Sequence, residues 1–250
     1  MSYAIAVAGK GGVGKSTIAA LLIRALAEKS REVVLAVDAD PNSNLGEKLG
    51  VKVDKTIGDL REDLLKKADE IPAGTSKQEF IRYQIQLALV EGDQFDLLTM
   101  GRPEGPGCYC YINNILRTFM DELVDDYAYI VIDNEAGMEH LSRRTTRKMD
   151  KLIVVSDATK LGVETAVRIK ELAEEMGLQI KSNMLVVNRS PPELHSVVEA
   201  VIKAGGFQDV RKVPNDKKIE ELAMVGEPLT RLDSTSPALR AVREIVRDLT

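Results

Sequence analysis

The 250-residue sequence contains no tryptophan, and aromatic residues of all kinds make up 4 % of it. Stacking platforms for the bases of single-stranded nucleic acid are therefore poorly supplied. Basic residues are not in excess either, because 34 Lys and Arg stand against 39 Asp and Glu, for a net charge of −5. An acidic chain has no electrostatic attraction to phosphate backbones, so DNA and RNA are not expected as partners.

Long hydrophobic runs are also missing. No apolar segment approaches the ~18 residues that a membrane span needs, and Tyr3–Ala8 is too short and lacks the charged start of a signal peptide. The sequence has only two cysteines, Cys108 and Cys110, which are too close together to staple a fold. These absences predict a cytoplasmic protein that makes no use of a membrane.

Short runs rich in Val and Ile do occur, and they alternate with segments of helical periodicity. Strands that are apolar throughout and alternate with helices indicate a parallel sheet covered on both faces. The sequence predicts one doubly wound α/β domain over residues 1–250, with a mainly parallel sheet. The predicted strands are 3–8, 32–37, 95–100, 127–132, 151–156, 183–187 and 209–213. The predicted helices are 15–29, 56–67, 77–90, 112–124, 161–176, 193–203 and 236–249.

The last predicted helix, residues 236–249, carries an apolar stripe. Ala238, Leu239, Val242, Ile245 and Val246 recur at spacings of three and four residues. A helix lying on a membrane surface would show the same periodicity, but this one carries charges of both signs and has no Phe or Trp. We therefore expect it to pack on the sheet.

A phosphate-binding motif lies between the first strand and the first helix. Residues 9–16 read Gly-Lys-Gly-Gly-Val-Gly-Lys-Ser and match the pattern G-x-x-x-x-G-K-[ST] in full. Its glycines let backbone N–H groups turn toward an anion, and the start of the helix adds its positive dipole end. We predict that ATP or ADP binds here, with Lys15 on the β- and γ-phosphates and the Ser16 hydroxyl on Mg²⁺. The predicted binding loop is Gly9, Lys10, Gly11, Gly12, Val13, Gly14, Lys15, Ser16 and Thr17.

Lys10 lies inside this loop, ahead of Gly11 and Gly12. With this residue the sequence resembles the deviant-Walker-A, or signature-lysine, ATPases. They include the nitrogenase iron protein, the MinD and ParA partition ATPases, and the arsenite-pump and tail-anchor targeting ATPases. In that superfamily the signature lysine reaches across a dimer interface to the nucleotide of the other protomer. The resemblance implies a homodimer that hydrolyses ATP, with Lys10 and Lys15 as catalytic residues.

The segment Asp38–Asn44 closes the second predicted strand and resembles switch I of the same superfamily. There the carboxylate that matches Asp40 orients or activates the attacking water, and the one that matches Asp38 helps to hold the water shell of the metal. Carboxylates at the carboxyl end of a parallel strand also point toward the crevice beside the phosphate loop on general grounds.

A second apolar strand, 127–132, is followed by Asp133 and resembles a Walker B strand. The resemblance implies that Asp133 lies near Mg²⁺ through water. Residues 133–137 resemble switch II, in which the glycine that matches Gly137 donates its amide to the γ-phosphate. Many relatives have Thr-Pro where this chain has Asn134-Glu135, so the role of Glu135 is open.

Two strand ends are candidates for base recognition. Asn188 and Arg189 end one strand, as the adenine-contacting Asn does in the superfamily, although Asn is also common in turns. Pro214, Asn215 and Asp216 follow a later strand, where relatives contact the base or ribose through backbone and side chain. The absence of an Asn-Lys-x-Asp element of the GTPase kind favours adenine over guanine.

The two cysteines follow residues 101–107, of which five of seven are Gly or Pro. This composition predicts a surface loop, and the start of the next predicted helix favours thiolates, which bind metals. Two thiolates are half of a closed tetrahedral site, and neither His140 nor His195 follows at a usual ligand spacing. Two chains meeting at a two-fold axis would supply four thiolates from Cys108 and Cys110, which suit Ni(II), Zn(II) or Cu(I). Incidental or redox-active thiols are the alternative.

Residues 102–110, together with 135–143, resemble the nickel-insertion ATPases of the CooC and AcsF type. Those proteins mature carbon monoxide dehydrogenase and acetyl-CoA synthase. The resemblance implies a homodimer that binds Ni²⁺ or Zn²⁺ at Cys108 and Cys110 and uses ATP to deliver it to a client enzyme. It leaves the choice of client open, and also the role of His140.

Two other functions stay open as alternatives. One is a positioning switch of the MinD or ParA type that binds membrane or DNA, which the acidic pI of about 5.3 disfavours. The other is an iron–sulfur electron donor like the nitrogenase iron protein, which uses two well-separated cysteines per chain. An ordinary P-loop kinase would leave Lys10 and both switch segments unexplained.

Overall fold

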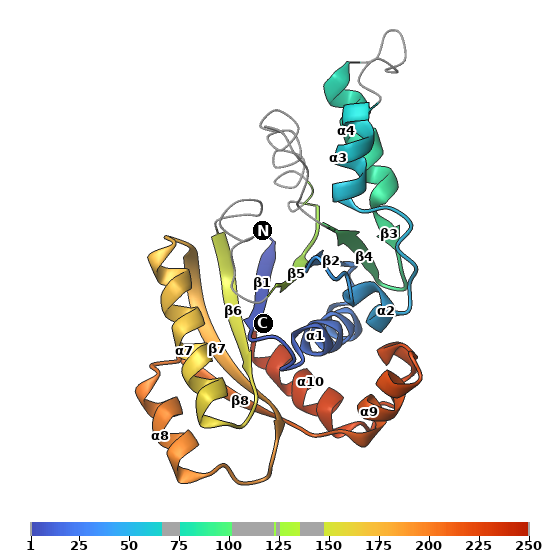
Figure 1. Cartoon of the computed structure of the whole chain (residues 1–250). Coiled ribbons are helices and arrows are strands. Elements are labelled where there is room, and N and C mark those ends of the chain that lie inside the picture. The colour runs from blue at the N-terminus through green and yellow to red at the C-terminus, as the bar shows by residue number, and fades with distance from the viewer. Residues whose placement is uncertain (1, 67–75, 102–122, 124–125, 136–147, 250) are drawn as a thin grey trace.

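The computed structural model describes residues 2–66, 76–101, 123, 126–135 and 148–249. In this part of the chain, eight strands form one sheet in the order β3-β4-β2-β5-β1-β6-β7-β8 (Figure 1). Neighbouring strands are parallel, except that β3 runs antiparallel to β4. The strands are β1 (Tyr3–Gly9), β2 (Val34–Ala39), β3 (Val90–Glu91), β4 (Phe95–Thr99), β5 (Tyr129–Asn134), β6 (Lys148–Ser156), β7 (Gln179–Ser190) and β8 (Asp209–Pro214). The predicted mainly parallel α/β sheet is confirmed.

Helices cover both faces of this sheet (Figure 1). One face carries α1 (Lys15–Ser30), α2 (Leu45–Leu49), α9 (Lys217–Met224), the 3-10 turn η1 (Leu229–Arg231) and α10 (Pro237–Leu249). The other face carries α3 (Ile57–Lys66) and α4 (Lys77–Ala88) over one half, and α7 (Lys160–Glu175) and α8 (Ser196–Ala204) over the other. The sheet is therefore covered by helices on both faces, as the sequence pattern predicts.

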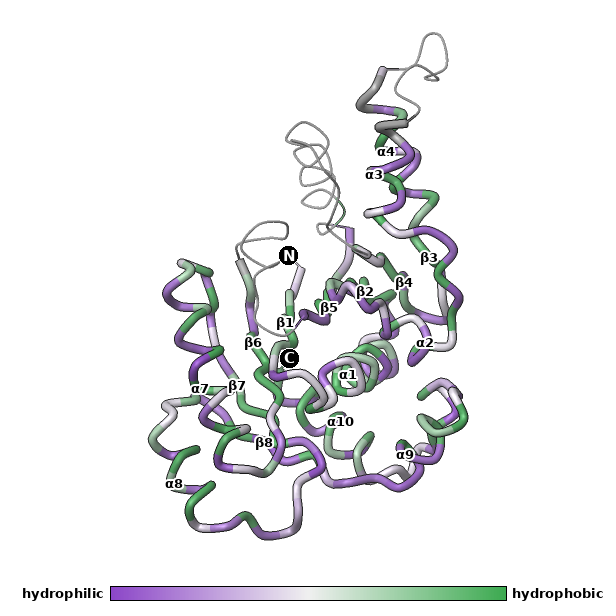
Figure 2. The backbone as a smooth tube through the Cα atoms, viewed as in Figure 1, coloured by the Kyte–Doolittle hydropathy of each residue, from purple (hydrophilic) through white to green (hydrophobic). Residues whose placement is uncertain are grey.

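The central strand β1 shows how the sequence divides the core between the two faces. Ile5 and Val7 point to the α1 side, whereas Ala4, Ala6 and Ala8 point to the opposite side. Successive side chains of a strand alternate between faces, so a strand buried on both sides is apolar at every position. Figure 2 shows the resulting hydrophobic colouring of the inner strands and of α1.

The apolar stripe of α10 lies in the core beneath α1. Leu239 and Val242 are fully buried, and the Lys29 ammonium group of α1 donates to the carbonyl of Val246 at the end of α10. The prediction that this helix packs on the sheet is confirmed. No helix among the described residues has both the length and the hydropathy to cross a bilayer.

Four short elements were not expected from the sequence: β3, α2, α9 and the 3-10 turn η1. β3, α2 and η1 are only two, five and three residues long, which is too short for a periodicity to show. Helix α9 begins directly after Asp216, whose carboxylate accepts from the backbone N–H of Lys218 and caps the helix. The predicted helix 112–124 falls outside the described residues, apart from position 123.

The strand order sets the place of a ligand site. From β1 the chain crosses to β2 on one side, whereas β6, β7 and β8 extend the sheet on the other side. In open α/β sheets such a reversal leaves a crevice outside the carboxyl ends of the strands. The glycine-rich loop 9–16 begins at the carboxyl end of β1, next to the ends of β5 and β6.

Candidate functional site

The backbone of the loop between β1 and α1 depends on three glycines with positive φ. Gly9 has φ of 153°, Gly12 has φ of 80° and Gly14 has φ of 94°. A Cβ atom on Gly14 would overlap the Asn188 amide, and one on Gly9 would overlap the Val155 carbonyl. No side chain caps the start of α1, and its first turn holds no acidic residue. The first N–H groups of α1 are therefore available to an anion.

Two side chains at the end of β7 bind backbone carbonyls of this loop. The Asn188 side-chain amide donates to the Val13 carbonyl at 2.8 Å, and the Arg189 guanidinium donates to the Gly12 carbonyl at 2.6 Å. Adjacent strand residues normally point to opposite faces. A register shift at this point and a left-handed Arg189, with φ of 50°, let both side chains reach the loop. Because the Gly12 and Val13 carbonyls point toward β7, the backbone N–H groups of the loop are free to face a phosphate on the other side.

The two lysines of the loop differ in burial. Lys15 is buried, and its ammonium group lies 3.4 Å from the Lys10 carbonyl across the turn of the loop. Lys10 itself is exposed. An exposed lysine at this position is compatible with a contact to a second chain, and the roles of both residues stay predictions.

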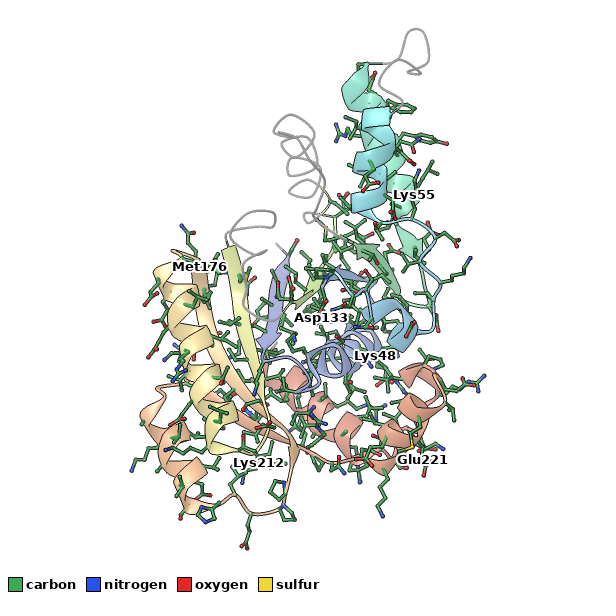
Figure 3. All side chains as sticks on the ribbon, viewed as in Figure 1. Lys48, Lys55, Asp133, Met176, Lys212 and Glu221 are labelled. Atoms are coloured by element: carbon green, nitrogen blue, oxygen red, sulfur yellow. The ribbon has the colours of Figure 1, made fainter. Side chains whose placement is uncertain are left out.

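Two buried carboxylates lie side by side at the carboxyl edge of the sheet. Asp38 of β2 and Asp133 of β5 are register partners, and both are fully buried. Asp38 accepts from the backbone N–H of Asp40 at 3.1 Å and of Leu45 at 2.9 Å. Neither oxygen of Asp133 accepts a hydrogen bond of ordinary geometry among the described residues, although the Ser16 hydroxyl lies near enough to lower the pKa of this carboxyl. Figure 3 shows Asp133 in the middle of the molecule beside α1.

Burial raises the pKa of Asp133 to about 7; the Ser16 hydroxyl opposes the shift and the Asp38 carboxylate adds to it. Burial also raises the pKa of Asp38 to about 6, although the backbone N–H groups of Leu45 and Asp40 oppose the rise. Two such carboxylates are costly to bury as anions unless a cation joins them.

These features fit a magnesium ion bound with a nucleotide. Hard oxygen ligands suit Mg²⁺, which keeps several waters and uses few protein groups. Ser16 at the start of α1 and the unpartnered oxygens of Asp133 are such groups, and Asp38 lies beside them. The predicted magnesium residues are thus brought together, whereas their individual roles stay predictions.

Asp40 is bonded within its own turn. Its carboxylate accepts from the backbone N–H and the side-chain amide of Asn42, both at 2.9 Å, and its carbonyl accepts from the Ser43 N–H. Ser43 has a left-handed φ of 52°. Both bonds from Asn42 end on the same carboxylate oxygen of Asp40, so the other oxygen can still accept from a water, and the predicted role of Asp40 stays a prediction.

A pocket of about 770 Å³ lies beside the loop, between the ends of β7 and β8. Its wall is formed by Arg189, Ser190, Pro191, Pro192, Lys212, Pro214, Asn215 and Glu220. Arg189 joins this pocket to the phosphate loop through its bond to Gly12. The space suits a base and sugar, and three of the residues predicted for base recognition, Arg189, Pro214 and Asn215, line it.

Asp216 has a structural place instead. Its carboxylate accepts from the backbone N–H of Lys218 at 3.0 Å and from the Ser236 hydroxyl at 2.5 Å. It therefore caps α9 and joins this helix to the start of α10. Asp216 does not line the pocket, so a nucleotide contact through its side chain has no support from the geometry.

Several predicted site residues lie outside the described residues, namely Gly137, Cys108, Cys110 and His140. His195 is described, and its ring nitrogen accepts from the Val197 N–H at the start of α8, which is a capping role. Within the part of the chain that the structure describes, no three His, Cys, Asp or Glu side chains form a candidate metal site.

Other residues of this region were not predicted from the sequence. The pocket is also lined by Lys212 and Glu220, and by Ser190, Pro191 and Pro192. Thr99, at the end of β4, is buried beside Asp38. Lys212 lies in β8 and Glu220 in α9, on either side of the predicted segment 214–216, which was a usable signal. Thr99 ends an apolar strand, and nothing local distinguishes it from a core residue.

The loop, the uncapped helix start and the paired carboxylates define a P-loop nucleotide-binding protein. A model of the CobQ/CobB/MinD/ParA nucleotide binding domain matches residues 4–229. The chain belongs to this family.

Relatives of known sequence extend over nearly the whole chain. An uncharacterized ATP-binding protein of Methanocaldococcus jannaschii is 48 % identical over 247 residues, covering 98 % of this chain and 97 % of the relative. The carbon monoxide dehydrogenase accessory protein CooC of Rhodospirillum rubrum is 29 % identical over 233 residues, covering 89 % and 87 %. The solved MinD cell division protein of Aquifex aeolicus matches with a TM-score of 0.72 at 25 % identity, over 99 % of this chain and 96 % of that one.

Proposed function

We propose that the protein is an ATP-hydrolysing metallochaperone that, as a homodimer, binds nickel through Cys108 and Cys110. It would assist nickel insertion into carbon monoxide dehydrogenase or acetyl-CoA synthase. The observation that carries this proposal is the Cys-x-Cys pair in a chain that combines a signature-lysine loop with similarity to CooC. The client is proposed by analogy with that relative, which is named as an accessory protein of carbon monoxide dehydrogenase.

The residues of the loop would perform the nucleotide chemistry. Lys15 and the amides at the start of α1 would bind the phosphates, while Ser16, Asp38 and Asp133 would hold Mg²⁺ directly or through water. Bound Mg²⁺ supplies positive charge to the β- and γ-phosphates. Asp40 would orient the attacking water through its second carboxylate oxygen, and the pocket beside Arg189 would take adenine.

A dimer would complete both sites. Lys10 is exposed, as a residue that reaches a second nucleotide must be. A tetrahedral thiolate site needs four donors, and one chain has two. Nucleotide exchange or hydrolysis would change the contact between the chains, and with it the geometry of the shared thiolates.

Metal titration of single-cysteine variants tests the proposal. We expect about one Ni²⁺ or Zn²⁺ per dimer in the wild type, and none bound tightly in Cys108→Ser or Cys110→Ser. ATP binding should be unchanged in both. Tyr109→Phe, which keeps both thiols, is the matched control. Unchanged metal stoichiometry in the serine variants would remove the cysteine site from the account.

The likeness to MinD favours a second candidate, a nucleotide-dependent positioning switch. Such a protein would bind a membrane or DNA when loaded with ATP. The apolar residues of α10 lie in the core, so that helix offers no free apolar face to a bilayer. ATP-dependent sedimentation with anionic lipid vesicles or with DNA would favour this second candidate over the first.

A further inference from the structure

Unpartnered buried polar atoms gather at one place in the described residues. The side-chain nitrogens and oxygens there that are buried without a hydrogen-bond partner belong to Thr99, Asp133 and Asn134. All three residues lie at the carboxyl ends of strands, Thr99 on β4 and the other two on β5. Asp38 lies between them, at the end of β2. A buried polar group without a partner costs about 1–3 kcal/mol, so such a cluster indicates a missing ligand.

The magnesium ion of the proposed function accounts for Asp133, but it does not account for Thr99. The Thr99 side chain is 1 % exposed, and its hydroxyl has no partner among the described residues. Valine has nearly the same shape as threonine and has no hydroxyl, so it would pack equally well at this position without leaving a polar group unpaired. The hydroxyl therefore calls for an explanation of its own.

Strand register places Thr99 directly beside Asp38. Thr99 pairs with Asp38, and Asp38 pairs with Asp133, so the three side chains form a row across β4, β2 and β5. Register partners in parallel strands point to the same face. Leu97 and Val131, two residues earlier on their strands, lie in the core under α1. The row therefore faces the side of the sheet on which α1 and Ser16 lie.

The Asp38 carboxylate has room for another donor. It accepts one hydrogen bond at each oxygen, from the backbone N–H groups of Asp40 and Leu45. A carboxylate offers about four acceptor positions. The Thr99 hydroxyl does not bond either Asp38 oxygen in this structure, so the bond requires a side-chain movement, such as a rotation of Thr99 or of the Asp38 carboxylate, when the ligand binds.

We propose that Thr99 is a positioning residue for the magnesium site. It acts by donating a hydrogen bond to the Asp38 carboxylate when the nucleotide and hydrated Mg²⁺ are bound. This inference rests on the nucleotide part of the proposed function and is independent of the cysteine pair. Thr99 fixes the Asp38 side chain from the β4 side, while the Asp40 and Leu45 amides fix it from the switch segment.

The test compares ADP affinity with Mg²⁺ and with EDTA in the full chain, by calorimetry or by a fluorescent ADP analogue. In Thr99→Val we expect the Mg²⁺-dependent gain in ADP affinity to fall about tenfold, since hydrogen bonds to charged groups are the stronger ones. ADP affinity in EDTA should be unchanged. Thr99→Ser should keep the gain within about twofold of wild type, because it keeps the hydroxyl.

Two further measurements make the result specific. If Thr99 acts through Asp38, Thr99→Val should cause no additional loss of the Mg²⁺-dependent gain in an Asp38→Asn background. If the valine variant does not fold, Thr99→Ala against Thr99→Ser gives the same comparison, because this pair differs by one hydroxyl.

Three outcomes would overturn the proposal: an unchanged Mg²⁺-dependent gain in Thr99→Val, an equal loss of ADP affinity in EDTA, or full additivity with Asp38→Asn. An unchanged gain together with a lower melting temperature would assign the hydroxyl to a buried water instead. A wild-type protein whose ADP affinity is independent of Mg²⁺ would contradict the proposed nucleotide site itself, which is a distinguishable failure.

Discussion

At the scale of single residues, the proposed magnesium site centres on two aspartates that the fold removes from water. Asp38 and Asp133 are buried at the carboxyl edge of the sheet, and no basic side chain among the described residues is bonded to either. A fold that holds two such groups gives up stability in its ligand-free state. Binding of a cation returns that stability, which links magnesium to the free energy of unfolding.

The pH dependence of stability tests this cost. The pKa of Asp133 is about 7 in the fold against 3.8 as the ordinary value, so the folded state binds the proton more tightly. The free energy of unfolding should therefore fall as pH rises from about 4 to about 7. Asp133→Asn removes this contribution, so the metal-free variant should be more stable than wild type at pH 8, by about 1–3 kcal/mol. The difference should vanish near pH 4.

Urea denaturation in EDTA at several pH values measures this effect. The same variant should lose the stabilisation that wild type gains from ADP with Mg²⁺. A metal-free Asp133→Asn protein that is less stable than wild type at pH 8 would show that the carboxylate is satisfied in the fold.

Asp216 provides a second test at this scale, because its sequence position and its contacts indicate different roles. Asp216→Ala removes a helix cap and the partner of the buried Ser236 hydroxyl. We expect the free energy of unfolding to fall by about 1–3 kcal/mol, with ADP affinity within about threefold of wild type. A large loss of ADP affinity in a protein of unchanged stability would return Asp216 to the nucleotide site.

At the scale of elements, the site depends on how β7 supports the loop between β1 and α1. Asn188 and Arg189 hold two successive loop carbonyls, and they can do so because the strand is irregular at Arg189. The loop is thus shaped by residues about 175 positions away in the chain. This arrangement explains why Gly14 leaves no space for a side chain.

Gly14→Ala tests this arrangement. The added methyl group would overlap the Asn188 amide, and the left-handed φ of 94° strains any residue other than glycine. We expect ADP affinity to fall at least about tenfold, because the loop must shift. Gly177→Ala is the matched control, since Gly177 has φ of 69° and open space around it at the end of α7. Equal ADP affinities in the two variants would mean that β7 does not set the loop geometry.

The elements that could be predicted from the sequence are those whose signals are local. The apolar run of β1, the glycine-rich loop and the long α1 lie next to each other in the chain, and each has its own pattern. Helix α9 has a readable start in Asp216 and apolar residues at Ile219 and Leu222, so its omission was an error of interpretation. Two-residue β3 carries no pattern of its own.

Likewise, only those site residues that belong to short, contiguous motifs could be predicted from the sequence. The positions of Ser16, Asp38 and Asp133 follow from motifs that each occupy one strand end. The contacts of Arg189 with Gly12, and of Thr99 with its neighbour Asp38, depend on residues far apart in the chain. A single sequence carries no direct signal of such pairs.

At the scale of the whole molecule, the account requires a second chain. Lys10 is exposed at the edge of the nucleotide site, and two thiolates cannot enclose a metal ion. Association would therefore be controlled by the nucleotide and would in turn control the metal. Oligomeric state, nucleotide state and metal content should change together.

Lys10→Ala separates association from nucleotide binding. We expect this variant to bind ADP with an affinity close to wild type, but to stay monomeric with ATP and to lose at least about 100-fold in ATP turnover. Lys203→Ala, which removes an exposed lysine from α8, should leave both properties unchanged. Light scattering with and without ATP, together with phosphate release, gives the comparison. A Lys10→Ala dimer of normal stability would contradict the assigned role.

The most direct test of the central claim is native mass spectrometry of the wild-type protein saturated with ATP and Ni²⁺ or Zn²⁺. The account predicts one species that contains two 27.5-kDa chains, nucleotide in each chain and a single transition-metal ion. A protein that remains a single chain under these conditions, or a dimer whose metal content is the same after both cysteines are replaced by serine, would contradict it.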